Sequence, residues 1–364
     1  MGFALITQIS NFFKNKKVLI TGHTGFKGTW LTIWLNAMGA KICGFSLAPP
    51  HTDNFFALSG IETAIFSITG DIRDFDALNK ACQNFKPEII LHLAAQALVK
   101  QSYRDPVETY STNIMGTVNL LEAVRLNPGI KAVINVTSDK CYENRNWLKG
   151  YTESDPMGGH DPYSSSKACS ELVTSAYMRS FFNLDAEAFN PAIASARSGN
   201  IIGGGDFAEN RLIPDMVRAF AKNKKVHIRY PNATRPWQYV LEPLLGYMML
   251  ALNLVDNGSQ FNGAWNFGPK PEDTREVGYI VDKFSSFMDC HDMWNLDPEK
   301  HPHEAGLLML DSSKAHTLLG WHTRLSVDTA IEWTANWYKF FQKDPRRILA
   351  FSQNQITSYE TLLK

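Results

Sequence analysis

The sequence is short of cysteine, of net charge and of long apolar runs, and each shortage excludes a class of protein. The five cysteines are odd in number, scattered and never spaced as CxxC, which argues against a disulfide framework and against a zinc site. Thirty-six basic residues balance thirty-six acidic ones without a basic stripe, so nothing predicts binding to nucleic acid or to a membrane surface. We therefore expect a small-molecule partner, no metal, and a location in the reducing cytoplasm.

Apolar residues are frequent but never continuous for long. No run approaches the roughly 18 apolar residues of a membrane span. The N-terminal MGFALITQISNFFKNKK has too short an apolar stretch for a signal peptide, and we interpret it as an amphipathic lead-in helix. With 364 residues, of which 44% are hydrophobic, the chain can form a large core and a smaller second region.

Strand-like and helix-like runs alternate through the first half of the chain. The strand-like runs are 16–21, 40–47, 64–69, 88–94, 131–137 and 186–195, and the helix-like runs are 26–38, 74–85, 107–126 and 164–181. Such alternation predicts parallel strands joined by crossover helices. The expected fold class is therefore α/β, a doubly wound, Rossmann-like parallel sheet that binds its ligands beyond the carboxyl ends of the strands.

The regular alternation of strand-like and helix-like runs ends at about residue 197. We expect a helix at 212–220, a short strand at 226–230 and a loop at 231–238. We place a dinucleotide-binding domain over residues 1–196 and a smaller, mainly substrate-binding domain over 197–364. Segments near 240–265 are predicted to pack back on the first domain.

The string TGHTGFKG forms a GxxGxxG array between the first strand and the first long helix. Glycines here let backbone N–H groups approach a pyrophosphate at the helix N-terminus, so the array predicts dinucleotide binding rather than a simple turn. The expected cofactor-binding residues of this turn are Gly22, Thr24, Gly25, Phe26 and Gly28. The second strand ends GFSLAPP, without the acid that usually holds the adenosine ribose, and His23 and Lys27 add charge to the loop.

Two later strand ends are candidates for the same ligand. Asp71 is placed to bond an adenine amine with Ile72 beside the ring, although an N-cap of the next helix explains Asp71 equally well. The fourth strand ends LHLAAQ, and its small residues would let backbone pass close beneath a cofactor or simply pack closely. The residues assigned there are Leu93, Ala94, Ala95 and Gln96.

Two polar motifs on consecutive elements predict a catalytic site. Ser138, Asp139 and Lys140 follow the fifth strand, where alone they would indicate only a polar turn. In YSSSK, Tyr163 and Lys167 stand four residues apart and share a helix face. A nearby ammonium and a positive nicotinamide ring would favour the phenolate, so that Tyr163 can act as a base near neutral pH.

These motifs resemble the extended short-chain dehydrogenases/reductases over essentially the whole chain and, within them, the nucleotide-sugar 4,6-dehydratases. The NIxGT signature of the family is present, with Asn113 expected at the cofactor. The members that act on dTDP-glucose have Thr-Asp-Glu where this chain has Ser138, Asp139 and Lys140. Lysine at the third position, with GHTGFKGTWL, GGGDFAENRLIPD and RPWQYVLEPLLGY, is typical of members that act on CDP-glucose.

The resemblance implies NAD as cofactor, CDP-D-glucose as substrate and a 4-keto-6-deoxy sugar nucleotide as product, in deoxysugar and O-antigen lipopolysaccharide synthesis. It implies that Tyr163 takes the proton of the sugar 4-hydroxyl while hydride passes from C4 to NAD⁺, and that Ser138 bonds the same oxygen. Asp139, kept protonated, would be the acid for the C6 hydroxyl. Lys140 could remove the C5 proton if desolvation or Lys167 lowered its pKa.

Substrate contacts are expected from the second region. Arg211 and Arg235 are candidates for the diphosphate, because a guanidinium fork matches phosphate oxygens, with structural ion pairing as the alternative. The resemblance adds Asn200, Leu212, Tyr239 and His303 as substrate-binding residues.

Other functions are compatible with the fold. An epimerase would keep Tyr163 and Lys167 but would not need an acid for C6, so Asp139 argues against it. A scaffold or sensor protein that binds NAD(H) without catalysis would be expected to lose one of the pair. We expect an enzyme that works as a homo-oligomer, a dimer or a tetramer.

Overall fold

The computed structural model describes residues 2–49, 54–182, 190–299 and 306–363. Within these residues a seven-stranded sheet forms the centre of the molecule, in the order β10-β6-β5-β4-β1-β2-β3, with every neighbouring pair parallel. Its strands are β1 (Lys17–Thr21), β2 (Lys41–Ser46), β3 (Phe66–Thr69), β4 (Ile89–His92), β5 (Ala132–Val136), β6 (Ala192–Ser198) and β10 (Gly263–Phe267). The predicted doubly wound parallel sheet is confirmed.

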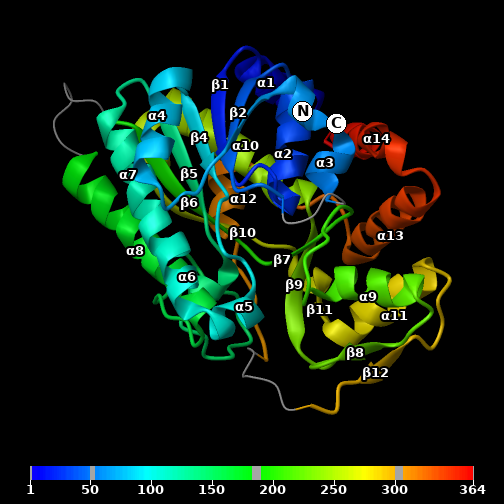
Figure 1. The fold of residues 1–364 in the computed structure, drawn as a ribbon. Coiled ribbons are helices and arrows are strands. Elements are labelled where there is room, and N and C mark those ends of the chain that lie inside the picture. The colour runs from blue at the N-terminus through cyan, green and yellow to red at the C-terminus, as the bar shows by residue number, and fades with distance from the viewer. Residues whose placement is uncertain (1, 50–53, 183–189, 300–305, 364) are drawn as a thin grey trace.

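Helices cover both faces of this sheet (Figure 1). One face carries α4 (Phe75–Phe85), α7 (Gly116–Leu126) and α8 (Pro162–Phe181), and the other carries α1 (Gly2–Phe13), α2 (Phe26–Ala37) and α10 (Leu241–Asn257). Side chains of a strand alternate between the faces, so Leu19 of β1 joins the core beneath α7, while Val18 and Ile20 join the larger core beneath α2 and α10. Apolar burial on both faces holds the sheet in place.

A smaller group of elements lies beside the main sheet, at the lower right of Figure 1. It contains a three-stranded sheet in the order β11-β9-β7 and a two-stranded sheet of β12 and β8. These strands are β7 (Asn200–Ile202), β8 (Val226–Ile228), β9 (Thr234–Tyr239), β11 (Thr274–Glu276) and β12 (Trp294–Leu296). The helices here are α9 (Leu212–Ala221) and α11 (Val277–Phe287). α13 (Val327–Lys343) packs on α11 and β9, and α14 (Ile348–Thr361), at the upper right of Figure 1, packs on α2.

Two sequence predictions about single elements are wrong. The predicted loop at 231–238 contains β9, which pairs with both β7 and β11, so pairing with two neighbours overrides the turn-like Pro-Asn-Ala and Pro236. The predicted helix at 107–126 is divided into α6 (Pro106–Tyr110), a π-helical turn (Ser111–Met115) and α7. Such π turns are frequent at functional sites, and this one carries Asn113.

Other expectations are met, and some elements were not foreseen. The lead-in helix is confirmed as α1, whose Ile9 and Phe13 are buried. The sequence did not predict β10, which completes the main sheet by pairing with β6, nor the short helices α3 (Phe55–Ser59), α5 (Val99–Arg104) and α12 (Ser313–Leu319). α10 packs on β5 and β6. The division of the chain at residue 196 stays a prediction.

A buried carboxyl group links the C-terminal elements to α10. Glu242, in the first turn of α10, is fully buried and accepts the hydroxyl of Tyr359 at 2.6 Å and the backbone N–H groups of Arg324 and Leu325 at 2.8 Å each. Burial raises the pKa of Glu242 to about 7, although these donors oppose the shift. The native state therefore holds this proton more tightly than the unfolded chain does.

We predict that Glu242→Gln flattens the pH dependence of stability. The contribution of Glu242 is fully present below about pH 4.5 and is lost as the pH rises through about 7, because its native pKa is the raised one. The free energy of unfolding of the wild type should therefore fall by about 3 kcal/mol more than that of the variant between these limits. Urea unfolding at several pH values measures the difference, with exposed Glu332→Gln as the control. Parallel curves for the wild type and Glu242→Gln would contradict the prediction.

Candidate active site

The glycine turn after β1 has a shape that only glycine allows. Gly22 has φ of +74°, and a Cβ on it would lie 2.6 Å from the backbone nitrogen of Ala94. A Cβ on Gly28 would lie 2.1 Å from the carbonyl oxygen of Gly22. Gly25 is the N-cap of α2 and has no side chain, so no cap side chain accepts the N–H groups of the first turn. The turn has the tight form that the array predicts, and its role in holding a pyrophosphate stays a prediction.

The loop after β4 lies directly against this turn. Leu93 N–H donates to the carbonyl oxygen of Thr21 at 3.0 Å, and Ala94 packs on Gly22, with Ala95 next in the chain. Asn113 joins this loop to α8, because its side chain accepts from Gln96 N–H at 2.9 Å and donates to Gln96 O at 3.0 Å and to the hydroxyl of Ser166 at 2.8 Å. The structure thus brings together the predicted residues of the glycine turn, the β4 loop and Asn113.

The two residues assigned to the adenine have other partners. Asp71 accepts from the side chain of Arg73 at 2.5 Å, and this bond lowers the pKa of the carboxyl group. The N-cap of α4 is Asp74, so the alternative interpretation of Asp71 as the cap is wrong. Ile72 is buried against Gly116 in the core beneath α7, which turns its side chain away from solvent.

The end of β2 offers hydroxyl groups where an acid is usual. The side chain of Thr24 lies 2.9 Å from the hydroxyl of Ser46 and donates to Leu47 O at 3.1 Å.

The ring of His23 is buried edge-on to Phe56, and burial lowers the pKa of His23 to about 4. His23 is therefore neutral at neutral pH, and the loop charge that we ascribed to it from the sequence is absent.

A short 3₁₀ turn after β5 holds the predicted triplet. The Ser138 hydroxyl donates to Asp139 Oδ1 at 3.0 Å and accepts the N–H of Lys140 at 3.2 Å. Lys140 Nζ donates to Asp139 Oδ1 at 3.2 Å and to Asn200 Oδ1 at 3.3 Å, which also brings Asn200 of β7 to the site. Asp139 is fully buried, and its Oδ2 has no hydrogen-bond partner in the described part of the chain. A buried free acceptor of this kind is costly without a ligand.

Tyr163 and Lys167 face this turn from the first two turns of α8. Asp161 caps the helix by accepting Ser164 N–H at 2.9 Å, and Pro162 starts it. Burial raises the pKa of Tyr163, and the charge of Lys140 and a hydrogen bond with Ser138 oppose that shift. Lys167 Nζ donates to the carbonyl oxygen of Val136 at 3.3 Å, and burial lowers its pKa to about 8. The two predicted motifs therefore form one polar cluster.

Lys27 belongs to this cluster and was not assigned to it from the sequence. Its ammonium lies 5.9 Å from the ring centroid of Tyr247, whose hydroxyl is 3.0 Å from that of Ser198. Burial lowers the pKa of Lys27 to about 7, and the positive charges of Lys167 and Arg211 lower it further. The only signal in the sequence was a basic residue inside a glycine turn, which we interpreted as loop charge.

Only some of the residues assigned to the substrate lie near the catalytic cluster. Arg211, the N-cap of α9 next to Leu212, pairs with Asp206 at 3.0 Å, and its charge also acts on Tyr163. Arg235 is buried and donates to the carbonyl oxygens of Thr234 and Gly306. His303 lies outside the described residues.

The structure contradicts the placement of Tyr239 at the substrate. Tyr239 is fully buried in the core beside Trp30 and Trp333, and its hydroxyl donates to Gln355 at 2.9 Å. Because strand residues alternate between faces, the side chain that follows Gln238 in β9 points into the core.

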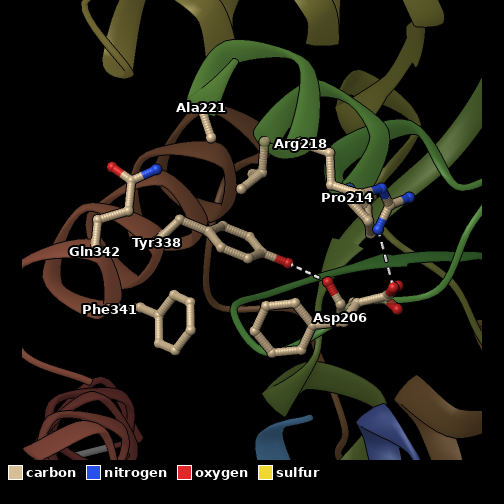
Figure 2. A pocket seen from close by; sticks show the side chains of 9 residues that line it. Asp206, Pro214, Arg218, Ala221, Tyr338, Phe341 and Gln342 are labelled. Carbon is tan, nitrogen blue, oxygen red and sulfur yellow. Dashed lines mark hydrogen bonds between the residues drawn. The ribbon is translucent and has the colours of Figure 1, made fainter. Parts of the chain in front are cut away.

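Figure 2 shows a cavity of about 210 Å³ between α9 and α13. The Tyr338 hydroxyl donates to the carbonyl oxygen of Asp206 at 2.5 Å, and Arg218 donates to that of Phe207 at 3.0 Å. These bonds hold the loop whose Asp206 carboxylate pairs with Arg211. The described lining is largely apolar and contains none of the predicted catalytic residues, so the cavity is distinct from the catalytic cluster.

Comparison with known proteins identifies one family, and relatives of similar sequence include nucleotide-sugar dehydratases. Residues 19–334 match the family model described as GDP-mannose 4,6 dehydratase. The chain is 49% identical over 350 residues to a CDP-glucose 4,6-dehydratase of Salmonella typhimurium, covering 96% of this chain and 97% of the relative. It is 26% identical to a probable dTDP-glucose 4,6-dehydratase of Sinorhizobium fredii, covering 88% and 92%.

Solved structures share the fold at low sequence identity. The dTDP-glucose 4,6-dehydratase of Streptomyces venezuelae, with NAD and TYD bound, has a TM-score of 0.78 at 21% identity and covers 90% of this chain and 98% of its own. The UDP-glucose 4-epimerase of Thermus thermophilus, in complex with NAD, has a TM-score of 0.76 at 22% identity and covers 89% and 99%. Dehydratases and epimerases therefore share this architecture.

We predict that Lys27 titrates near pH 7 and responds to the charge at position 167. The rate of acetylation of Lys27 should rise around that pH in the wild type, because only the neutral amine reacts. Lys167→Met removes a positive neighbour and should raise the pKa of Lys27, whereas Lys167→Arg keeps the charge and should change it little. Mass spectrometry of the labelled peptide, with exposed Lys80 as the internal standard, measures both effects. If the acetylation rate of Lys27 had the same pH dependence in all three proteins, the predicted effect of the charge at position 167 on the pKa of Lys27 would be contradicted.

Proposed function

The chain belongs to the GDP-mannose 4,6-dehydratase family, and on this premise we propose that it converts CDP-D-glucose to CDP-4-dehydro-6-deoxy-D-glucose and water. One observation carries the reaction type: Tyr163 and Lys167 share a cluster with a buried acid, Asp139, that keeps an unpartnered oxygen beside Lys140. The 49% identical relative named CDP-glucose 4,6-dehydratase supports the choice of nucleotide. The product would enter deoxysugar synthesis for O-antigen lipopolysaccharide.

NAD is the proposed cofactor, and it supplies a hydride acceptor for C4 and, once reduced, a hydride donor for C6. The turn from Gly22 to Gly28 would hold its pyrophosphate, since a Cβ at either end would collide with backbone. The β4 loop and Asn113 would lie beneath the nicotinamide half. Thr24 and Ser46 would offer hydroxyl groups to the adenosine ribose in place of the usual acid.

Tyr163 is the proposed base for the 4-hydroxyl of the sugar. Burial alone raises the pKa of its phenol, so positive charge near the oxygen must favour the ionised form. Among the groups of this chain, Lys140 contributes most of that charge, rather than Lys167 as the sequence suggested. Ser138, which bonds Tyr163, would hold the same sugar oxygen during proton removal.

The contact between Asp139 and Lys140 can carry out the elimination with a balanced set of protons. After Tyr163 has taken its proton, the Lys140 ammonium would pass its own proton to Asp139 across their contact. The resulting neutral amine takes the proton from C5, while Asp139 gives its proton to the C6 oxygen, which leaves as water. The pair then stands as ammonium and carboxylate, the ion pair found at 3.2 Å. The ammonium returns its proton to C5 as C6 is reduced, and the proton that Tyr163 took then passes to Lys140, which restores the ammonium and the phenolate.

Charge in the cluster suits a nucleotide diphosphate. Arg211 and Lys27 reach the same region, and a diphosphate would bring negative charge to it. Asn200, bonded to Lys140, is placed to contact the sugar. Arg235, with Leu212 and His303, remains a proposal for the nucleotide side, while Tyr239 is not carried over because its hydroxyl is used in the core.

We also propose a homo-oligomer, a dimer or a tetramer, in the cytoplasm. Val107, Tyr110 and Leu172 are exposed on α6 and α8, which contact each other, so these two helices offer apolar side chains to a second copy. All five cysteines lie in the described residues as free thiols, as suits a reducing compartment. No helix in the described residues is both long and apolar enough to cross a membrane.

We predict that Tyr163→Phe lowers turnover of CDP-glucose by on the order of 10²- to 10⁴-fold, because it removes the base for the first step. The fold should survive, since the ring remains, and a circular dichroism melt checks this. The base-induced absorbance of the 4-keto-6-deoxy product measures turnover for CDP-, dTDP- and UDP-glucose. A near-normal rate in the variant would overturn the mechanism, and a preference of the wild type for dTDP-glucose would overturn the choice of nucleotide.

Asp139→Asn and Lys140→Met should stop the reaction after oxidation at C4. We expect both variants to accumulate the reduced cofactor on the enzyme, because the first step needs neither residue as acid or C5 base. Lys140→Met should do so more slowly than Asp139→Asn, because it also removes the charge that favours the Tyr163 phenolate. Lys140→Met should also lose exchange of the C5 hydrogen with solvent, while Asp139→Asn should keep it. Single-turnover absorbance with deuterium incorporation read by mass spectrometry separates the two. Normal C5 exchange in Lys140→Met would rule Lys140 out as the base.

A further inference from the structure

A buried ion pair lies next to the catalytic cluster, and no hydrogen bond in the described residues joins it to Ser138–Lys140, Tyr163 or Lys167, although the charge of Glu171 opposes the effect of burial, which lowers the pKa of Lys167. Glu171 follows Tyr163 and Lys167 on α8 at intervals of four residues, so the three side chains lie along one face of the helix. Its carboxylate accepts two parallel bonds from Arg197 at the end of β6, at 2.9 and 3.0 Å. Both residues are almost fully buried. A bidentate pair of this kind has one well-defined geometry.

The same ion pair holds both ends of the catalytic turn. On one side the hydroxyl of Thr137 donates to Glu171 Oε1 at 2.5 Å. On the other side Arg197 Nη1 donates to the hydroxyl of Tyr142 at 2.7 Å. Thr137 immediately precedes Ser138, and Tyr142 follows Cys141, so the segment that carries Ser138, Asp139 and Lys140 is bracketed by two side chains fixed to one ion pair.

Tyr142 is fixed further by its surroundings. Its hydroxyl donates to Asn266 of β10 at 2.7 Å, its ring stacks on that of Tyr151 at 5.1 Å, and the guanidinium of Arg197 lies 4.9 Å from its ring centroid. Asn266 in turn donates to the carbonyl oxygens of Tyr151 and Asp311. The end of the turn is thus tied to β6, to β10 and to the segment before α8.

We propose that the Glu171–Arg197 pair, acting through Thr137 and Tyr142, is a positioning device that sets the Ser138–Lys140 turn against Tyr163 and Lys167. The inference rests on the proposed function, because it assigns the device to the dehydratase reaction. The elimination needs an acid, a base and the Tyr163 oxygen around one sugar ring, and a displacement of about 1 Å can cost on the order of 100-fold in rate. The ion pair supplies that precision without touching the substrate.

Single hydroxyl deletions test the device while leaving the ion pair in place, since removing either charge would strand the other in the core. Thr137→Val and Tyr142→Phe should each lower kcat by on the order of 10- to 100-fold while KM for CDP-glucose changes less than about threefold. Thr137→Ser restores the hydroxyl and should restore kcat. The double variant should lose less than the product of the single losses, because both changes release one turn.

Thr174→Val is the matched control. Thr174 lies on the same face of α8, is equally buried, and its hydroxyl accepts from Asn135 Nδ2 at 2.8 Å rather than holding the turn. It should lower the urea midpoint about as much as Thr137→Val does and leave kcat near the wild-type value. Equal kcat in the two variants, or unchanged kcat in Thr137→Val, would overturn the proposal.

Amide hydrogen exchange separates this inference from the proposed function. Residues 138–142 should exchange faster in Thr137→Val than in the wild type and in Thr174→Val, whatever the substrate. A wild type that turns over no nucleotide glucose would defeat the proposed function alone. Unchanged exchange across the turn in Thr137→Val would defeat the positioning role even if the dehydratase activity is present.

Discussion

A buried row of polar side chains along α8 fixes where this helix lies against the sheet, and the reactive groups depend on that position. Ser166 bonds Asn113, Ser170 bonds Thr117 and Asn135, and Glu171 bonds Thr137 and Arg197. Burying so many polar groups is unfavourable unless each finds a partner, and here each does. A helix shifted by one residue would break every one of these bonds at once. These bonds therefore fix the position of α8 along the sheet. Because Tyr163 and Lys167 belong to the same helix, their positions are fixed as well.

The cluster carries strong local charge in a chain with no net charge. Lys27, Lys140, Lys167 and Arg211 act on one another around the buried Asp139. Burial lowers the pKa values of Lys27 and Lys167 to about 7 and about 8, so the site holds fewer protons near neutral pH than its count of lysines implies. An anionic ligand would stabilise the protonated amines, which couples binding of a diphosphate to the charge around Tyr163. Overall composition could not show this, because it gives the total of positive and negative side chains and not where they gather.

The sequence predicted those features whose geometry is local. The spacing of Tyr163 and Lys167 and the glycines at 22, 25 and 28 specify a helix face and a tight turn directly, and the structure shows both. Features that depend on distant partners were missed. β10 joins the sheet only by pairing with β6. Asp71 was misassigned for a local reason, because Arg73 binds its carboxylate and Asp74 caps α4. Tyr239 was assigned by resemblance, which matches the type of residue but not the face of the strand on which it lies.

Fold alone does not distinguish the two reactions found on this architecture, since a dehydratase and an epimerase match it about equally well. Under the proposed mechanism, the turn after β5 distinguishes them. Oxidation and reduction at C4 need a base such as Tyr163, whereas loss of water across C5 and C6 needs an acid and a base on adjacent carbons. Asp139 and Lys140 are neighbours in one turn with their side chains in contact at 3.2 Å, so they can face adjacent carbons and exchange the proton that the elimination moves. A fully buried carboxyl oxygen without a partner has no evident use in an epimerase, and in a dehydratase it is where the departing hydroxyl would sit.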